Sequence, residues 1–294
     1  ETDFFGHKLR IPVLLAPMGG IERFSANGGI DVDNAAEQFG SVNFLSTVCQ
    51  PSLEEVAENS PHAKSFQIYV RGDDEWIKDL VQRAVKAQYA SVTLTVDSAF
   101  YGNRERLNPA QLALRRVPAR EWQKKITWET VKLIKDALGN IPLILKGIMT
   151  AEDAALAVEH NVEGIYISNH GGRQLDHVLG NIQMLPEVVS AVDGKAEVFI
   201  DGGFTRGTDI VKALILGAKA VGIGRLQAYA LGAGGAEGLI RCLELLEQEI
   251  NTTMGLIGVT SLDQLSSESI TEAMPVTLPH EHSAFPHLPG GQVC

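Results

Sequence analysis

Cysteine is scarce in this chain of 294 residues, which has three: Cys49, Cys242 and Cys294. They form no Cys-x-x-Cys pair and no even set, so no disulfide framework is expected. Reduced thiols in a cytosol are the simplest interpretation, and no secretory signal precedes the first apolar segments. The sequence therefore predicts a cytoplasmic protein.

Long apolar runs and an excess of positive charge are also missing. No stretch reaches the roughly 18 apolar residues of a transmembrane helix, so no membrane span is expected. The formal net charge of -11 at pH 7 argues against a nucleic-acid partner. A hydrophobic content of 45% and a charged content of 21% are typical of a globular protein that buries a sizeable core.

The final segment, 275–294, is rich in proline and carries three histidines, His280, His282 and His287. A loose terminus, either disordered or draped over the protein, is the favoured interpretation, and metal binding by these histidines is the alternative. No metal site is predicted for the rest of the chain.

Eight short apolar runs recur along the chain, and each is continuous rather than alternating with polar residues. Such runs are typical of parallel strands that helices cover on the outside. The expected strands are 12–16, 42–46, 66–70, 92–96, 142–146, 164–168, 197–201 and 220–224.

Helical patterns separate most of these runs. Capped starts are expected at Ser52 and Thr150, and apolar residues recur at helical spacing elsewhere. The expected helices are 52–58, 74–88, 127–138, 150–159, 186–192, 208–216 and 239–250. Strands alternating with helices predict a single-domain α/β fold, the (β/α)8 or TIM barrel, over 1–294. A doubly wound sheet is the alternative, although it rarely needs eight such units.

Polar residues and glycines follow the carboxyl ends of the expected strands. In a (β/α)8 barrel the loops at this end form the active-site face, so these groups are expected to converge on one mouth. They are Pro17, Met18, Gly19, Ser46, Gln67, Tyr69, Thr95, Asp97, Lys146, Ser168, His170, Arg173, Asp201, Gly202, Gly203, Gly224 and Arg225.

Within this set, His170 and Arg173 suggest acid–base chemistry on a carboxylate. A guanidinium can hold a carboxylate by two parallel hydrogen bonds. An imidazole three residues away can then take a proton from the neighbouring carbon or from its hydroxyl. For so short a motif, His-Gly-Gly-Arg at 170–173, a solvated polar turn is the alternative.

Several other strand ends suggest an anionic ligand. Lys146 is costly to bury unless it meets an anion or a polar ligand, although it could reach the rim instead. Asp201 could orient His170, or it could cap the turn that follows. Gly202-Gly203 and Gly224-Arg225 follow the seventh and eighth strands, where this architecture binds phosphate.

These motifs together resemble the FMN-dependent L-2-hydroxy acid oxidase and dehydrogenase family, which includes glycolate oxidase, lactate oxidase, mandelate dehydrogenase and the flavin domain of flavocytochrome b2. The resemblance runs from about residue 5 to residue 265, and its most specific part is Ser168–Asp176. It implies FMN as cofactor, oxidation of a small-molecule L-2-hydroxy acid to a 2-oxo acid, and reoxidation by oxygen or a redox partner. It also implies a homotetramer.

The resemblance further implies roles for individual residues. His170 would be the catalytic base, with Asp201 paired to it. Arg173 and Arg104 would bind the substrate carboxylate, and Tyr69 would hydrogen-bond the substrate. Lys146 would stabilise the anionic reduced flavin beside its N1–C2 carbonyl region. The other flavin-binding residues would be Pro17, Met18 and Gly19 through backbone, Ser46, Gln67, Thr95 and Ser168 around the ring, and Asp201, Gly202, Gly203, Gly224 and Arg225 along ribityl and phosphate.

The chain departs from the family pattern at two informative positions. Thr205 stands where the family usually has a phosphate-binding arginine, so Arg206 could supply that contact. Val48 stands where glycolate oxidase-like members carry a tryptophan over the substrate, which predicts a wider pocket.

Two alternatives stay open: oxidation of an amine or another specialised substrate on the same scaffold, and a flavin-binding barrel without turnover. The complete set of His170, Arg173, Asp201 and Lys146 argues against the latter.

Overall fold

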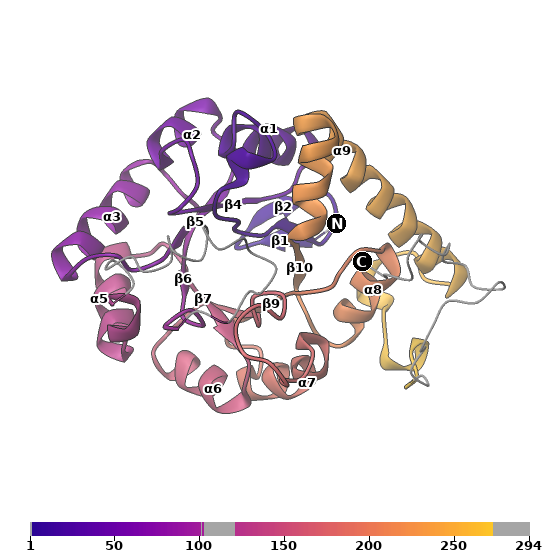
Figure 1. The fold of residues 1–294 in the computed structure, drawn as a ribbon. Coiled ribbons are helices and arrows are strands. Elements are labelled where there is room, and N and C mark those ends of the chain that lie inside the picture. Colours follow the sequence, from indigo (N-terminus) through magenta and orange to yellow (C-terminus); the bar gives the residue numbers. More distant parts are fainter. Residues whose placement is uncertain (1, 101, 103–120, 273–294) are drawn as a thin grey trace.

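A closed barrel of eight parallel strands forms the centre of the protein, as the computed structural model shows for residues 2–100, 102 and 121–272 (Figure 1). Each strand pairs with the next along the chain, and the last pairs with the first. The barrel strands are β3 (Val13–Leu15), β4 (Asn43–Ser46), β5 (Lys64–Ile68), β6 (Ser91–Thr95), β7 (Leu143–Ile148), β8 (Gly164–Ile167), β9 (Glu197–Asp201) and β10 (Ala220–Ile223). The predicted (β/α)8 architecture is confirmed.

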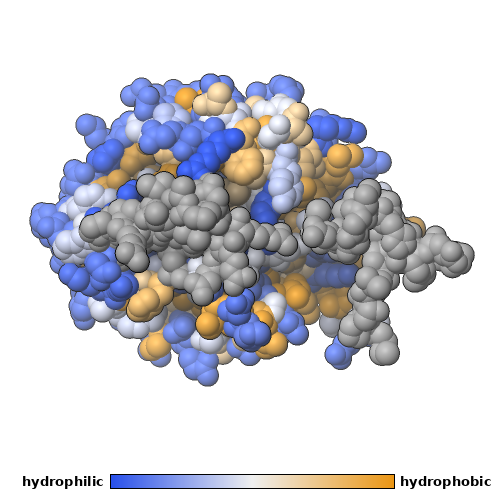
Figure 2. Space-filling view, viewed as in Figure 1, coloured by the Kyte–Doolittle hydropathy of each residue, from blue (hydrophilic) through white to orange (hydrophobic). Residues whose placement is uncertain are grey.

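Helices surround the barrel, and each packs an apolar face against the strands (Figure 1). On the face seen in Figure 2, polar and apolar residues are interspersed over this ring, as expected for helices that bury one side. The described helices are α1 (Gly29–Phe39), α2 (Leu53–Asn59), α3 (Asp74–Lys86), α5 (Trp128–Leu138), α6 (Ala151–Glu159), α7 (Asn181–Val192), α8 (Gly207–Ile215) and α9 (Arg225–Leu256). No helix among the described residues is long and apolar enough to span a bilayer.

Helix boundaries show where local signals succeed and fail. The Ser52 hydroxyl accepts from the Glu55 backbone while the Glu55 carboxylate accepts from the Ser52 backbone, so the predicted start of α2 is confirmed. The predicted start of α7 is wrong, because Pro186 lies inside the helix rather than in its first turn. The predicted 239–250 helix is the second part of α9, which is non-helical at Gly234 and Gly235.

The amino-terminal end of the barrel is closed by a hairpin that the sequence pattern did not reveal. β1 (Thr2–Phe4) pairs antiparallel with β2 (His7–Leu9). Phe4 is fully buried and packs edge-on against Phe44, with ring centroids 5.5 Å apart. Tyr166 and Phe199 complete the aromatic cluster inside the barrel. Each such ring contributes roughly 1.5–3 kcal/mol of burial free energy, so this end supplies stability.

Candidate active site

The carboxyl end of the barrel carries a row of buried polar side chains from adjacent strands. Ser46 at the end of β4 donates its hydroxyl to Gln67 Oε1 on β5 over 2.6 Å. Gln67 Nε2 donates to the Thr95 hydroxyl at the end of β6 over 2.8 Å. All three residues are at most 3% exposed. The predicted set is thus brought together as a rigid polar edge, because parallel strands end at the same rim.

His170 lies on a sharp turn just after β8. Its φ of 61° is left-handed, and those of Gly171 and Gly172 are 67° and 73°. A non-glycine residue in this region is uncommon. The Asn169 side-chain oxygen accepts from the Gly172 backbone over 3.0 Å and holds the turn. The two glycines are needed because three successive left-handed residues with side chains would be strained.

The His170 imidazole is fixed from both sides. Its Nδ1 lies 2.9 and 3.0 Å from the two carboxylate oxygens of Asp97, which follows β6. Its Nε2 lies 3.1 Å from the hydroxyl of Tyr69, which follows β5. Because a carboxylate can only accept, Nδ1 carries the proton and Nε2 presents its lone pair. The His170 and Asp97 side chains are 19% and 11% exposed, so this pair is only partly open to water.

The predicted pairing of Asp201 with His170 is wrong. Asp201, at the end of β9, instead forms an ion pair with Lys146 Nζ at 2.8 Å. The reason is the buried ammonium: an unpaired lysine charge in the barrel interior is far more costly than an exposed one. Asp201 is the last residue of β9 and Asp97 lies two residues after β6, so both lie near a strand end, and that position alone could not distinguish the two aspartates.

Lys146 lies inside the barrel and does not reach the rim. It is 5% exposed. Besides its ion pair with Asp201, it donates to the Ser168 hydroxyl over 2.6 Å and lies over the Tyr166 ring at 4.7 Å. The lysine is therefore held with its charge beside the mouth, where it can stabilise negative charge on a bound ligand.

The glycine loops after β9 and β10 form a second part of the site. Gly202 and Gly203 have φ values of 96° and 88°, a conformation that residues with side chains rarely adopt. α9 begins at Arg225 directly after Gly224, so its first N–H groups face the carboxyl end of the barrel. The Arg225 guanidinium is exposed and donates to the Gly171 carbonyl over 3.2 Å. These groups suit a phosphate.

Arg206, the predicted substitute for the missing phosphate-binding arginine, has a different partner. Its guanidinium pairs with Glu249 of α9 at 2.8 Å, and its backbone N–H donates to Asp209 over 3.0 Å. A carboxylate therefore already neutralises this charge, and the geometry supports Arg206 as a phosphate ligand less than it supports Arg225.

The remaining predicted residues lie around the mouth. Arg173 is exposed, and it has no ion-pair partner among the described residues. Pro17 and Met18 are half-buried after β3, and Gly19 is exposed. A Cβ on Gly19 would lie 2.5 Å from Val48 Cγ2, so the loops after β3 and β4 touch. Arg104 and the 275–294 tail lie outside the described residues.

The donor set fits FMN. Ser46, Gln67 and Thr95 match the edge of a flat heterocycle, and Lys146 supplies a fixed cation. Two buried oxygens, Asp201 Oδ1 and Asn181 Oδ1, have no hydrogen-bond partner within the described ranges. Buried acceptors of this kind normally find a donor, and sugar-alcohol hydroxyls are suitable ones.

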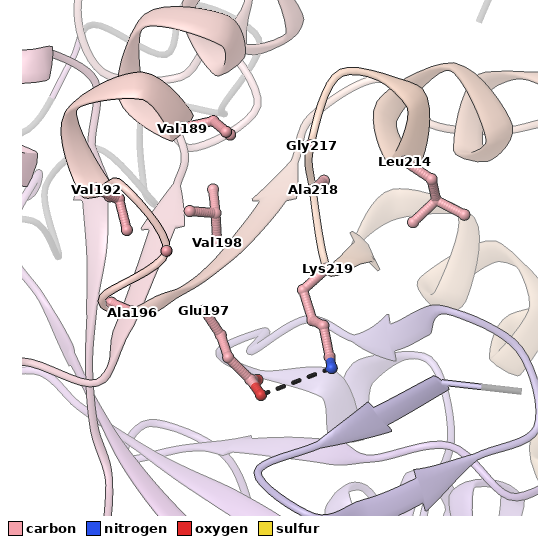
Figure 3. A pocket seen from close by; sticks show the side chains of 10 residues that line it. Val189, Val192, Ala196, Glu197, Val198, Leu214, Gly217, Ala218 and Lys219 are labelled. Carbon is pink, nitrogen blue, oxygen red and sulfur yellow. Dashed lines mark ion pairs between the residues drawn. The ribbon is translucent and has the colours of Figure 1, made fainter. Parts of the chain in front are cut away.

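A separate cavity of about 380 Å³ lies at the opposite end of the barrel (Figure 3). Val189 and Val192 of α7, Val198 of β9 and Leu214 of α8 line it, and Glu197 and Lys219 point toward one another there. None of the predicted site residues lines this cavity.

A (β/α)8 barrel with a paired histidine, a buried lysine and glycine loops that suit a phosphate at its carboxyl end is the arrangement expected of a flavin-dependent oxidoreductase. The comparisons with known proteins agree. Residues 1–121 and 108–272 match the family described as FMN-dependent dehydrogenase, and the chain belongs to that family. It is accordingly an FMN-dependent oxidoreductase, and the resemblance to the FMN-dependent 2-hydroxy acid oxidase and dehydrogenase family inferred from the motifs is confirmed.

Relatives of known activity cover most of the chain. It is 38% identical to an L-lactate oxidase of Nostoc sp. over 296 residues, covering 90% of this chain and 81% of the relative. It is 35% identical to the glycolate oxidase of Spinacia oleracea, covering 92% of this chain and 79% of the relative. A solved structure of mandelate oxidase with (S)-2-phenylpropionate superposes with a TM-score of 0.80 at 37% identity, covering 89% of this chain and 78% of the other.

Proposed function

We propose that this enzyme oxidises a small L-2-hydroxy acid to the corresponding 2-oxo acid, with His170 as base and Arg173 as the main carboxylate ligand. The observation that carries the proposal is the fixed row of Asp97, His170 and Tyr69 at the barrel mouth. Arg104, which lies outside the described residues, is the proposed second carboxylate ligand.

The proton is taken by His170 Nε2. Asp97 accepts the Nδ1–H bond, so the basic lone pair is held on the side that Tyr69 faces. As the substrate loses a proton to Nε2, the imidazolium that forms is stabilised by the Asp97 carboxylate beside it. FMN, when bound, supplies the two-electron acceptor for the hydroxyl-bearing carbon.

The other residues of the proposed site orient the substrate and neutralise the negative charges of the substrate and the cofactor. The exposed guanidinium of Arg173 matches a carboxylate geometrically, and the phenol of Tyr69 is placed to hydrogen-bond the substrate hydroxyl. Lys146 keeps a cation beside the polar edge of Ser46, Gln67 and Thr95, where the flavin ring is proposed to bind. Arg225 and the glycine loops are proposed to hold ribityl and phosphate.

The electron acceptor, the oligomeric state, the location and the size of the substrate are supported less directly. Several relatives are named oxidases, which favours oxygen as the electron acceptor. A homotetramer and a cytoplasmic location stay predictions. Val48 is 37% exposed at the mouth, which favours a substrate bulkier than glycolate.

The direct test is anaerobic mixing of the FMN-loaded enzyme with lactate, glycolate and (S)-mandelate in turn, while the flavin absorbance is followed. We expect loss of the yellow colour with at least one acid and one equivalent of the 2-oxo acid per flavin. A matched panel of primary amines probes the alternative substrate class. If dithionite reduces the flavin but no hydroxy acid does, the proposal is wrong, and reduction by an amine would replace it.

A further inference from the structure

Gln123 is a buried glutamine that lies outside the barrel strands but contacts two of their ends. It belongs to a short 3-10 helix, η3 (Gln123–Lys125), that precedes α5, and it is 5% exposed. Its Oε1 accepts from the Val70 backbone N–H over 2.7 Å. Its Nε2 donates to the Thr95 carbonyl over 2.5 Å and lies 3.4 Å from the Ser98 hydroxyl.

These contacts fall on either side of the residues that hold His170. Val70 directly follows Tyr69, and Thr95 and Ser98 flank Asp97. One amide group therefore connects the segment that carries the Nε2 partner of His170 to the segment that carries its Nδ1 partner. Thr95 is the last residue of β6, Val70 lies two residues after the end of β5, and Ser98 lies three residues after the end of β6, so the contacts are made where the strands end.

A glutamine is suited to this task. Its amide offers an acceptor and two donors in one plane, whereas a carboxylate offers only acceptors and an apolar side chain offers neither. Buried backbone groups that lose such a partner must move or stay unpaired. A second glutamine holds the same turn from the other side: Gln174 Nε2 donates to the carbonyls of Asp97 and Phe100 over 2.8 and 2.9 Å.

We propose that Gln123 is a positioning residue that sets the geometry of Tyr69 and Asp97 around His170. The inference rests on the proposed function of His170 as the base. Displacing a reacting group by about 1 Å can cost on the order of 100-fold in rate. Loss of the Gln123 amide is therefore expected to slow the chemical step while substrate and flavin still bind.

The test replaces Gln123 by methionine, which keeps the length and removes both hydrogen-bonding functions. Gln123→Glu is the second variant, since it keeps the acceptor for Val70 but loses the donor to Thr95 when ionised. Gln264→Met is the matched control: Gln264 also accepts from a backbone N–H, that of Thr260 over 2.7 Å, but lies in the short helix η4 (Leu262–Gln264) after α9.

Two readouts are measured on the FMN-loaded proteins. The first is the rate of anaerobic flavin reduction at saturating hydroxy acid, with its half-saturating concentration. The second is the downfield proton resonance of His170 Nδ1–H in the NMR spectrum, assigned by its loss in His170→Ala, which requires no turnover. We expect Gln123→Met to slow reduction about 10- to 100-fold, to leave half-saturation within threefold, and to shift or broaden the resonance. Gln264→Met should change neither.

The outcomes separate the two proposals. If the His170 Nδ1–H resonance is unchanged in both Gln123→Met and Gln123→Glu, the positioning role is overturned, whatever the rate of flavin reduction. The role is also overturned if the resonance shifts but flavin reduction stays within threefold of the wild-type rate. If the resonance shifts but no hydroxy acid reduces even the wild-type flavin, the proposed function fails and the geometric role of Gln123 stands. Should Gln123→Met not fold, Gln123→Glu is measured against the same criteria.

Discussion

The two ends of the barrel are built from the same strands but from opposite kinds of side chain. Tyr166 of β8 belongs to the aromatic cluster inside the barrel, while Ser168, directly after β8, accepts a hydrogen bond from Lys146 at the carboxyl end. Phe4 and Phe199 close the amino end with apolar contacts. This division places stability at one end and chemistry at the other, as the architecture generally does.

The charged groups of the two ends differ as well. At the carboxyl end Lys146 pairs with Asp201 at 2.8 Å and His170 with Asp97 at 2.9 Å. At the amino end, Lys219 pairs with Asp3 at 2.7 Å but lies 3.9 Å from Glu197, whose buried Oε2 has no hydrogen-bond partner in the described part of the chain. Burial raises the pKa of the Glu197 carboxyl, with Lys219 opposing and Asp3 adding to that effect. Of these four carboxylates, only Glu197 lies more than 3 Å from its basic partner.

The largest effect on the stability side is expected from Phe199→Ala. Removing this buried ring from the amino-end cluster leaves a cavity beside Phe4 and Tyr166, and should lower the free energy of unfolding by about 3–5 kcal/mol. Urea unfolding of the FMN-loaded protein measures the loss. The folded fraction should reduce its flavin with hydroxy acid within about threefold of wild type; a far slower rate would show that the two ends are not separable.

Arg225→Ala should affect the cofactor without affecting the amino end. The variant loses a charge-assisted contact to phosphate, so FMN should bind about 10- to 100-fold more weakly, while riboflavin, which has no phosphate, changes little. Fluorescence titration of the apoprotein with both ligands measures the difference. Equal weakening of FMN and riboflavin would place Arg225 away from the phosphate, and Lys212→Ala on the exposed side of α8 is the control.

Arg173→Lys tests whether the carboxyl end of the barrel binds the carboxylate of the substrate. The charge is kept but the two-pronged geometry is lost, so reduction by the hydroxy acid should slow by about tenfold or more. The methyl ester of the same acid has no carboxylate to hold and should be much less affected. Single-turnover reduction with both compounds measures the ratio; an equal loss for acid and ester would remove Arg173 as the carboxylate ligand.

The smallest effect is a pH dependence at the amino end. Because the folded-state pKa of Glu197 is raised above its unfolded value, its stabilising contribution is complete at low pH and is lost as pH rises through the folded pKa. Glu197→Gln removes that loss. The variant should melt like wild type near pH 4 and at a higher temperature than wild type near pH 7. A difference that is constant with pH would show that Glu197 does not titrate in this range.

The strands and the mouth were predictable because buried parallel strands are continuous apolar runs and their carboxyl ends share one rim. The hairpin around Phe4 was not, since each of its strands has three residues and little pattern. α1 was missed because it begins at Gly29 and buries Asp31 and Asp33, which mask its apolar face.

The sequence also failed to predict which basic side chain each aspartate at the barrel mouth contacts. Asp97 and Asp201 both lie near the carboxyl end of a strand, and their partners depend on which basic group each carboxylate meets in three dimensions. The role of Gln123 was equally hidden, because its three contacts are to segments between 25 and 53 residues away. Such contacts leave no signal in local sequence spacing.

The central claim, that the chemistry resides in His170 at the carboxyl end, is tested most directly by His170→Ala. The measurement is the rate of anaerobic flavin reduction by the best hydroxy acid, taken with FMN content and melting temperature. Loss of a general base should slow reduction by roughly 10²–10⁴-fold, while FMN content and melting temperature stay close to wild type. Reduction within about tenfold of wild type in fully FMN-loaded, folded variant would contradict the account.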